Sequence, residues 1–195
     1  LDLTYEKTNL IAVKKPVFPF NKFPKQNIFL SPEMRSTGEV IGFDTQLGSA
    51  YAKAEIGAGN NLPLKGKVFV SVNNSDKNDI IKIARDLIEM QFNIIATKGT
   101  AQLLIQNGVF CKQIFKAGEG RPNIVDEIKN GKISMIINTP LGAQSRYDEQ
   151  KIGMAAIRHN VLVLTTISGS QAAIRGIRIM KTGKLSHLSL QEIFN

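Results

Sequence analysis

From Lys67 onward, apolar and polar residues alternate in blocks whose period changes along the chain. Short apolar runs typical of buried strands recur between longer segments in which apolar residues are spaced three or four apart. The clearest helical stripe runs from Ile80 to Ile88, and Ser75 or Asp76 is placed to cap that helix. The expected strands are 68–72, 93–96, 112–115, 133–138 and 161–165, and the expected helices are 76–91, 100–107, 124–130, 148–159 and 168–180.

These strands are apolar throughout rather than alternately apolar and polar. Strands of that kind are buried on both faces, as they are in a parallel sheet covered by helices on each side. The alternation of strand and helix supports this arrangement because each helix can cross over between two parallel strands. Residues 62–195 are therefore predicted to form one α/β domain around a five-stranded parallel sheet.

Residues 1–61 have a pattern that does not predict a self-sufficient domain. Two short strand-like runs, 11–13 and 17–20, are interrupted by prolines such as Pro16, as in an edge or irregular strand. Residues 45–56 are expected to form an amphipathic helix that Gly57 ends, with one apolar side made by Leu47, Ala50, Tyr51 and Ala54. These elements bury little by themselves, so we expect them to pack against something outside the chain.

Composition narrows the class of protein. Of 195 residues, 43% are apolar, which is enough for a core. The single cysteine, Cys111, excludes a disulfide framework and is typical of a reducing setting, so we expect a cytoplasmic protein. No segment approaches the roughly 20 consecutive apolar residues of a membrane span, so no membrane partner is expected. The chain begins with Leu1 rather than Met, and we expect it to be a piece of a longer polypeptide.

The net charge of +9 is unevenly distributed. Residues 62–195 carry 18 Lys or Arg against 10 Asp or Glu, whereas residues 1–61 carry 7 against 6. An excess of this kind attracts anions. The basic residues are scattered, with few aromatic residues between them, so we expect no nucleic-acid partner. Small phosphorylated ligands fit the pattern better.

Small polar and basic residues gather where the predicted strands end. Ligands of open parallel sheets bind outside the carboxyl ends of the strands, near the point where the strand order reverses. The residues at these positions are Ser71 with Lys77 after it, Thr97 and Thr100, Lys116, Asn138 and Thr139, and Thr165. A simpler interpretation is that the threonines cap a helix and the lysines are solvated. Their recurrence at all five strand ends favours a binding site.

The segment Thr97-Lys98-Gly99-Thr100 suits a phosphate in particular. Two hydroxyls, the free N–H groups of a helix start and the helix dipole converge there, and Gly99 allows close approach of the backbone. Lys77 and Lys116 could add positive charge to the same site. The sequence therefore predicts an anion site at this edge of the sheet.

No catalytic or metal-binding group is recognisable in residues 62–195. His159 and His187 have no evident carboxylate or serine partner at a strand end, and both are expected to be surface or capping residues. No residue is recognisable as the partner of Cys111 in a catalytic dyad, so a buried thiol is expected there. No metal-spaced His/Cys set, phosphate-binding P-loop or dinucleotide-binding glycine motif occurs.

Several stretches resemble one enzyme family. The segments 17–23 and 32–40, followed by Ala50-Tyr51-Ala52-Lys53-Ala54, resemble the end of the second ATP-grasp half of the carbamoyl-phosphate synthase large subunit. The segments 96–100, 119–122, 128–131 and 136–139 resemble its C-terminal domain, which is called methylglyoxal-synthase-like. The resemblance covers nearly the whole chain. It implies an ATP-grasp remnant at 1–61 and a Rossmann-like, methylglyoxal-synthase-like allosteric domain at 62–195.

The resemblance also implies a function. The family makes carbamoyl phosphate for pyrimidine and arginine synthesis from bicarbonate, glutamine-derived ammonia and two ATP. Its C-terminal domain binds effectors such as UMP and IMP, and the residues that hold the nucleotide phosphate match Ser71, Lys77, Thr97, Thr100, Lys116, Asn138 and Thr139 of this chain. ATP, Mg²⁺ or Mn²⁺ and K⁺ are expected in the full enzyme but not in this fragment, which is expected to be inactive alone. The expected partners are the upstream part of the large subunit and the glutaminase small subunit.

One of the positions that depart from the family bears on the choice of effector. Members that respond to ornithine carry a glutamate where this chain has Lys15, although Thr165, another contact residue in the family, is present. A cation facing the ammonium group of ornithine would repel it. The resemblance therefore implies nucleotide control more strongly than ornithine control.

Two alternatives remain at this point. Methylglyoxal synthase shares the fold, but its two catalytic aspartates match Arg121 and Thr139, so a base for proton abstraction is missing. An effector-blind module for homo-oligomerisation would keep the fold and the pocket without regulation.

Overall fold

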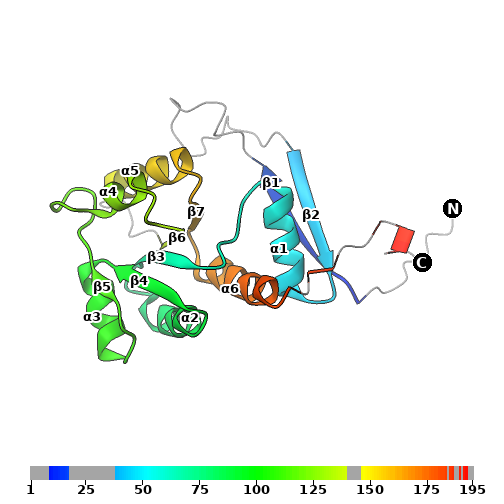
Figure 1. The fold of residues 1–195 in the computed structure, drawn as a ribbon, viewed down its shortest axis with the longest axis horizontal. Coiled ribbons are helices and arrows are strands. Elements are labelled where there is room, and N and C mark those ends of the chain that lie inside the picture. The colour runs from blue at the N-terminus through cyan, green and yellow to red at the C-terminus, as the bar shows by residue number, and fades with distance from the viewer. Residues whose placement is uncertain are drawn as a thin grey trace.

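The protein is described by a computed structural model that covers residues 9–17, 38–139, 146–183, 185–186, 189 and 191–192. From Gly66 onward, strands and helices alternate (Figure 1). The strands are β3 (Gly66–Ser71), β4 (Phe92–Ala96), β5 (Lys112–Gln113), β6 (Met135–Asn138) and β7 (Leu162–Leu164). The helices are α2 (Lys77–Glu89), α3 (Lys98–Gln106), α4 (Ile124–Lys129), α5 (Arg146–Arg158) and α6 (Ile167–Lys181).

The five strands form one parallel sheet in the order β5-β4-β3-β6-β7, which confirms the predicted α/β fold. The chain first moves outward from β3 to β4 and β5, and then returns to the other side of β3 with β6 and β7. The strand order therefore reverses between β3 and β6. In the register of that pair, Ser71 lies opposite Asn138.

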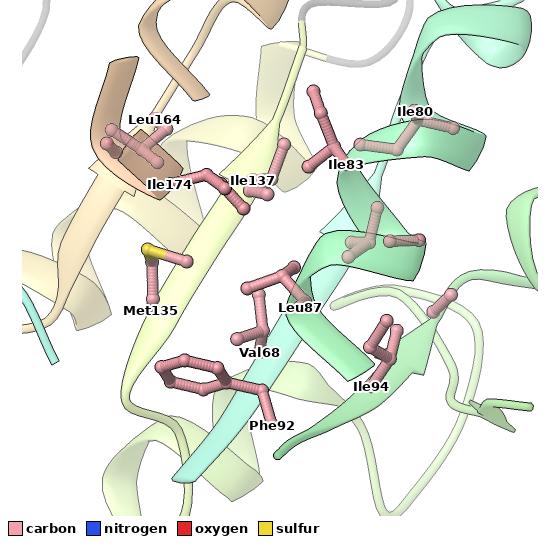
Figure 2. Packing of buried hydrophobic residues seen from close by; sticks show 14 of the residues in the cluster. Val68, Ile80, Ile83, Leu87, Phe92, Ile94, Met135, Ile137, Leu164 and Ile174 are labelled. Atoms are coloured by element: carbon pink, nitrogen blue, oxygen red, sulfur yellow. The ribbon is translucent and has the colours of Figure 1, made fainter. Parts of the chain in front are cut away.

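Both faces of the sheet are covered because successive strand residues point to opposite sides. Val68 and Val70 of β3 belong to the core beneath α2, α3 and α6, part of which is drawn in Figure 2. Phe69, between them, belongs to a second core beneath α4 and α5. The apolar residues of β3 thus fill a core on each face of the sheet, as predicted, whereas β5 consists of the exposed Lys112 and Gln113.

The first part of the chain forms an antiparallel ribbon and a helix. The elements are β1 (Ile11–Val17), β2 (Gly38–Asp44) and α1 (Leu47–Gly57). Strand β2 was not predicted, and the expected break at Pro16 is wrong because Pro16 lies within β1 opposite Glu39. In a two-stranded ribbon each strand has a free edge, where a proline without an N–H group costs no ladder bond. The predicted run 17–20 lies outside the described residues after Val17.

Helix α1 lies between this ribbon and α6 (Figure 1). A Cβ atom at Gly48 would lie 2.8 Å from the carbonyl carbon of Arg175 in α6, and one at Gly42 would lie 2.1 Å from the carbonyl oxygen of Ala50. The helix is therefore buried on two sides rather than on the single side predicted, and Ala52 and Glu55 are buried as well. Part of the packing partner expected for this region thus lies within the chain, because α1 packs against α6.

No helix in the described part of the chain is long and apolar enough to cross a membrane.

Candidate functional site

Five small polar side chains meet at the carboxyl edge of the sheet, where the strand order reverses. They come from the ends of β3, β4 and β6 and from the start of α3. Each is at most 9% exposed. We call them the strand-end cluster: Ser71, Thr97, Thr100, Asn138 and Thr139. The structure thus brings together five of the seven residues that the sequence suggested for phosphate binding.

The hydroxyl groups of the cluster contact one another. Thr97 Oγ1 lies 3.3 Å from Ser71 Oγ and 3.4 Å from Thr100 Oγ1. A backbone N–H group also bonds to the cluster, since Asn73 N–H donates to Thr139 Oγ1 at 3.0 Å. Hydroxyl–hydroxyl bonds are usually about 2.7–2.8 Å long, so the contacts of Thr97 are weak. An anion that accepts from these hydroxyls would replace weak bonds with charge-assisted ones.

The two helices that begin beside the cluster lack side-chain caps. Thr97 and Asp76 occupy the N-cap positions of α3 and α2, and neither side chain makes a capping hydrogen bond. The N-cap positions expected for Asp76 and Thr97 are confirmed, but neither side chain makes the capping hydrogen bond that the prediction implied. Asn123 and Thr166, in contrast, cap α4 and α6 with their side chains. The first N–H groups of α2 and α3 thus keep their donor capacity for another acceptor.

Lys77 supplies positive charge at the same place. It is the first residue of α2 and half-buried, and a Cβ atom at Gly99 would lie 3.9 Å from its Nζ atom. Its ammonium group therefore lies over the first turn of α3. Lys116 lies in the loop after β5, where its backbone N–H donates to Glu119 Oε2 at 3.2 Å. Among the described contacts, none joins the ammonium group of Lys116 to the cluster.

The sequence reasoning missed the part played by Asn73 in the loop between β3 and α2. The side-chain oxygen of Asn73 accepts from Asp76 N–H at 3.0 Å, and its amide group donates to Asp76 Oδ2 at 2.8 Å. These bonds hold the loop so that Asn73 N–H reaches Thr139. The signal was available, because Asn and Asp after a strand are typical of such side-chain-stabilised turns.

Lys15 is paired within the protein. Its ammonium group bonds to Glu55 of α1, whose side chain is 1% exposed and also accepts from Asn60 Nδ2 at 2.8 Å. Burial, together with the nearby Glu55 carboxylate, raises the pKa of Tyr51. Lys15 therefore neutralises a buried carboxylate instead of presenting a free cation. Thr165 follows β7 and is exposed.

The remaining reactive residues show no catalytic arrangement. Cys111 is buried, burial raises the pKa of its thiol, and its Sγ atom contacts the carbonyl oxygen of Ala101 at 3.8 Å. The prediction of a buried thiol is confirmed. His159 is exposed at the end of α5, as expected for a surface residue, and His187 lies outside the described residues. No group of His, Cys, Asp and Glu within the described ranges could hold a metal ion.

Comparison with known proteins identifies the family of this chain. A family model described as "MGS-like domain" matches residues 79–165, which include Thr97, Thr100, Asn138 and Thr139. The carbamoyl phosphate synthase large chain of Archaeoglobus fulgidus is 48% identical over 95% of this chain. That of a Nostoc species is 45% identical over 93% of this chain.

The chain spans only 17% and 16% of the length of these two relatives. A shorter relative, the carbamoyl phosphate synthase large chain, C-terminal section, of Aquifex aeolicus, is 42% identical over 100% of this chain, which covers 37% of it. The family-model match and these high-coverage relatives all point to the same region. This chain therefore belongs to the carbamoyl phosphate synthase large chain family and corresponds to its C-terminal region, which carries the MGS-like domain.

Proposed function

We propose that the strand-end cluster binds the phosphate group of a nucleoside monophosphate effector such as UMP or IMP. The observation that carries the proposal is the uncapped start of α3 beside buried hydroxyls, with the ammonium group of Lys77 over its first turn. A phosphate dianion needs several donors and a positive charge, and both gather here. The side chain of Lys116 would close the site from the loop after β5.

We further propose that the whole protein is a glutamine-dependent carbamoyl-phosphate synthase. It would make carbamoyl phosphate for pyrimidine and arginine synthesis in the cytoplasm. Residues 1–61 would end the second ATP-grasp half, and residues 62–195 would form the allosteric domain. ATP, Mg²⁺ or Mn²⁺ and K⁺ would bind to parts of the enzyme outside this chain, and a glutaminase subunit would supply ammonia.

Calorimetric titration of the 195-residue chain with UMP and with IMP tests the effector site. We expect binding of at least one nucleotide, and we expect Lys77→Ala to weaken it about tenfold or more, because one charge-assisted hydrogen bond contributes about 1.5–3 kcal/mol. Lys116→Ala tests the loop in the same way. Lys82→Ala, which removes an exposed lysine on the same helix as Lys77, is the matched control and should leave binding unchanged.

The opposite results are equally clear. If a chain shown to be folded by circular dichroism released no heat with either nucleotide, the oligomerisation-module alternative would replace this proposal. If Lys77→Ala and Lys82→Ala weakened binding equally, the binding would be nonspecific charge attraction. Ornithine should give no heat, because this chain has Lys15 where the members of the family that respond to ornithine carry a glutamate.

A further inference from the structure

An open groove runs between α4 and α5, on the face of the sheet opposite α6. Its volume is about 580 Å³. Val125, Met154 and Ala155 give it an apolar floor. Five basic side chains surround this floor, from the loop before α4, from both helices and from the end of α5: Arg121, Lys129, Lys151, Arg158 and His159. All five are exposed.

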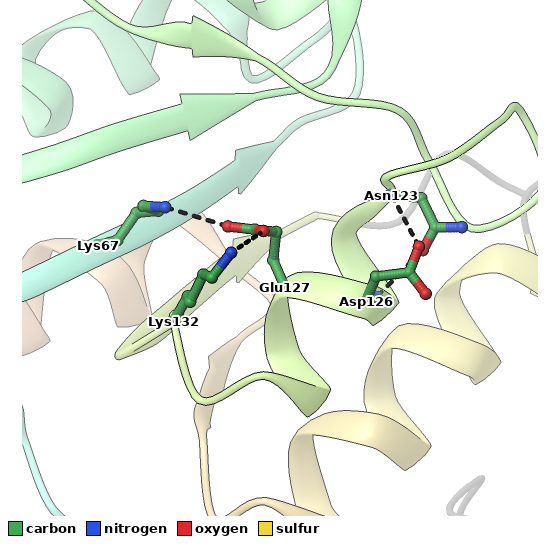
Figure 3. A network of polar contacts seen from close by, with 5 residues as sticks. All are labelled: Lys67, Asn123, Asp126, Glu127 and Lys132. Carbon is green, nitrogen blue, oxygen red and sulfur yellow. Dashed lines mark hydrogen bonds and ion pairs between the residues drawn. The ribbon is translucent and has the colours of Figure 1, made fainter.

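The polar groups fixed within the groove are already engaged. Asn123 accepts from the N–H groups of Val125 and Asp126, and its amide group donates to the carbonyl oxygen of Gly120 at 3.0 Å. The Asp126 carboxylate accepts from Asn123 N–H at 3.1 Å and completes the capping box (Figure 3). These bonds occupy the side chain of Asn123 and one oxygen of the Asp126 carboxylate, which leaves few polar atoms to orient a bound small molecule.

The neighbouring acid also points elsewhere. Glu127 bonds to Lys67 and Lys132, each at 3.1 Å, on the other side of α4 (Figure 3). It therefore does not neutralise the basic rim. The groove combines an apolar floor with exposed basic side chains, whereas the strand-end cluster offers buried, converging hydroxyls. Small nucleotides are recognised by a few precisely directed polar groups, so the groove suits a larger partner better.

We propose that the α4–α5 groove binds an acidic amphipathic helix of a separate polypeptide. The groove side of α5 presents Lys151, Met154, Ala155 and Arg158, a spacing of one helical face. A helix laid between α4 and α5 would place its apolar stripe on Met154 and Val125. Carboxylates on its two flanks would then meet Arg121 and Lys129 on one side and Lys151 and Arg158 on the other.

The arrangement of the fold favours a partner in trans. The ribbon β1–β2, through which the chain connects to residues before Ile11, packs on α1, and α1 packs on α6, whereas α4 and α5 cover the other face of the sheet (Figure 1). A segment that continues from the ribbon before Ile11 therefore starts on the side of the sheet opposite the groove. A separate polypeptide can approach the groove directly.

A synthetic peptide tests the proposal. The probe is a fluorescein-labelled 14-residue peptide with a leucine and methionine stripe between two rows of glutamate, and a scrambled peptide of the same composition is its control. Fluorescence anisotropy with the 195-residue chain should show binding of the first peptide that is at least tenfold tighter than binding of the second. Saturating UMP should not displace it, because UMP is expected at the strand-end cluster.

Charge-reversed variants separate the groove from the overall positive charge. Arg121→Glu/Lys129→Glu should weaken peptide binding about tenfold or more. Lys65→Glu/Lys82→Glu changes the net charge by the same amount at exposed lysines outside the groove and should change binding less than twofold. Met154→Asp, which places a carboxylate in the floor, should weaken binding as strongly as the first variant, and circular dichroism checks that each variant is folded.

Four results would overturn the proposal. Equal losses in the two double variants, or equal affinity for the two peptides, would leave only nonspecific charge attraction. Displacement of the peptide by ATP, added so that its concentration of negative charges equals that of the peptide, would mean that the groove binds a small polyanion. A dimer of the chain in light scattering that Arg121→Glu/Lys129→Glu abolishes would make a second copy the occupant. Failure of UMP binding alone would leave this proposal standing and count against the effector site instead.

Discussion

Two pairs of helices in this protein meet in opposite ways. Between α1 and α6, glycines bring the two backbones together, and a Cβ atom at Gly176 would lie 3.2 Å from the carbonyl oxygen of Gly48. Between α4 and α5, side chains hold the helices apart around a groove of about 580 Å³. The cation beside the first pair, Lys15, is bonded to a buried carboxylate, whereas the cations of the second pair are exposed.

The difference separates a structural contact from a surface that can receive a partner. Glycine contacts leave no room for added atoms, so the α1–α6 contact joins the first part of the chain rigidly to the sheet domain. An open groove with a charged rim keeps its apolar floor accessible. Four substitutions follow from this distinction, and three of them have a counterpart in the other helix pair or in the same element.

The largest effect is expected at the buried ion pair. Lys15→Met should lower the free energy of unfolding by about 3 kcal/mol, because it leaves the Glu55 carboxylate buried without its cation. Lys129→Met, at the exposed rim of the groove, should change it by less than about 0.5 kcal/mol. Urea unfolding followed by circular dichroism measures both. Equal effects would mean that the buried pair contributes no more than a surface cation, and Lys15→Met/Glu55→Gln should recover part of the loss.

The next effect concerns the glycine contact. Gly48→Ala should destabilise the protein by about 2 kcal/mol, since its Cβ atom would lie 2.8 Å from the backbone of Arg175. Gly57→Ala in the same helix places its Cβ atom 3.5 Å from Val40, an ordinary contact, and should be neutral or stabilise by up to about 1 kcal/mol. Thermal unfolding of the two variants gives the comparison. A stable Gly48→Ala variant would show that α1 and α6 can separate at little cost.

A smaller and pH-dependent effect is expected at Glu127, on the side of α4 away from the groove. Hydrogen bonds from Lys132 and Lys67 lower the pKa of Glu127 below its ordinary value of 4.5. A carboxyl group with a lowered pKa stabilises the fold above its unfolded pKa and loses that contribution as the pH falls through the folded pKa. Glu127→Gln should therefore cost about 1 kcal/mol at pH 7 and progressively less below pH 4.5. Urea unfolding at pH 7, about 5 and about 3.5 checks this trend, and a difference that does not change with pH would contradict it.

The smallest effect is expected where the groove has room. Val125→Met adds length to the apolar floor and should change the free energy of unfolding by less than about 0.5 kcal/mol. The same measurement on Ala52→Met, in the closed contact between α1 and α6, should show a loss of about 1–3 kcal/mol. If both variants were equally tolerated, the two helix pairs would not differ in packing, and the comparison would fail.

The fold of the sheet domain could be predicted from the sequence because its strands and helices have local patterns of apolar residues. Apolar runs at 68–72, 93–96 and 133–138 correspond to β3, β4 and β6, and the alternation with helices indicated parallel pairing. The predicted strand at 112–115 is shorter in the structure, since only Lys112 and Gln113 pair with β4. The gathering of Ser71, Thr97 and Asn138 also followed from their places at strand ends, while their role in binding phosphate stays a prediction.

What the tertiary structure alone decided depends on contacts between residues far apart in the chain. The periodicity of the sequence does not indicate the pairing of β2 with β1, the burial of α1 on two sides or the bond between Lys15 and Glu55. The same is true of helix ends, since only the fold shows that the hydroxyl of Thr97 turns toward Ser71 rather than capping α3. Periodicity records which side of an element is buried, but not what buries it or how closely. For that reason the groove between α4 and α5, and with it the proposed docking site, came from the structure.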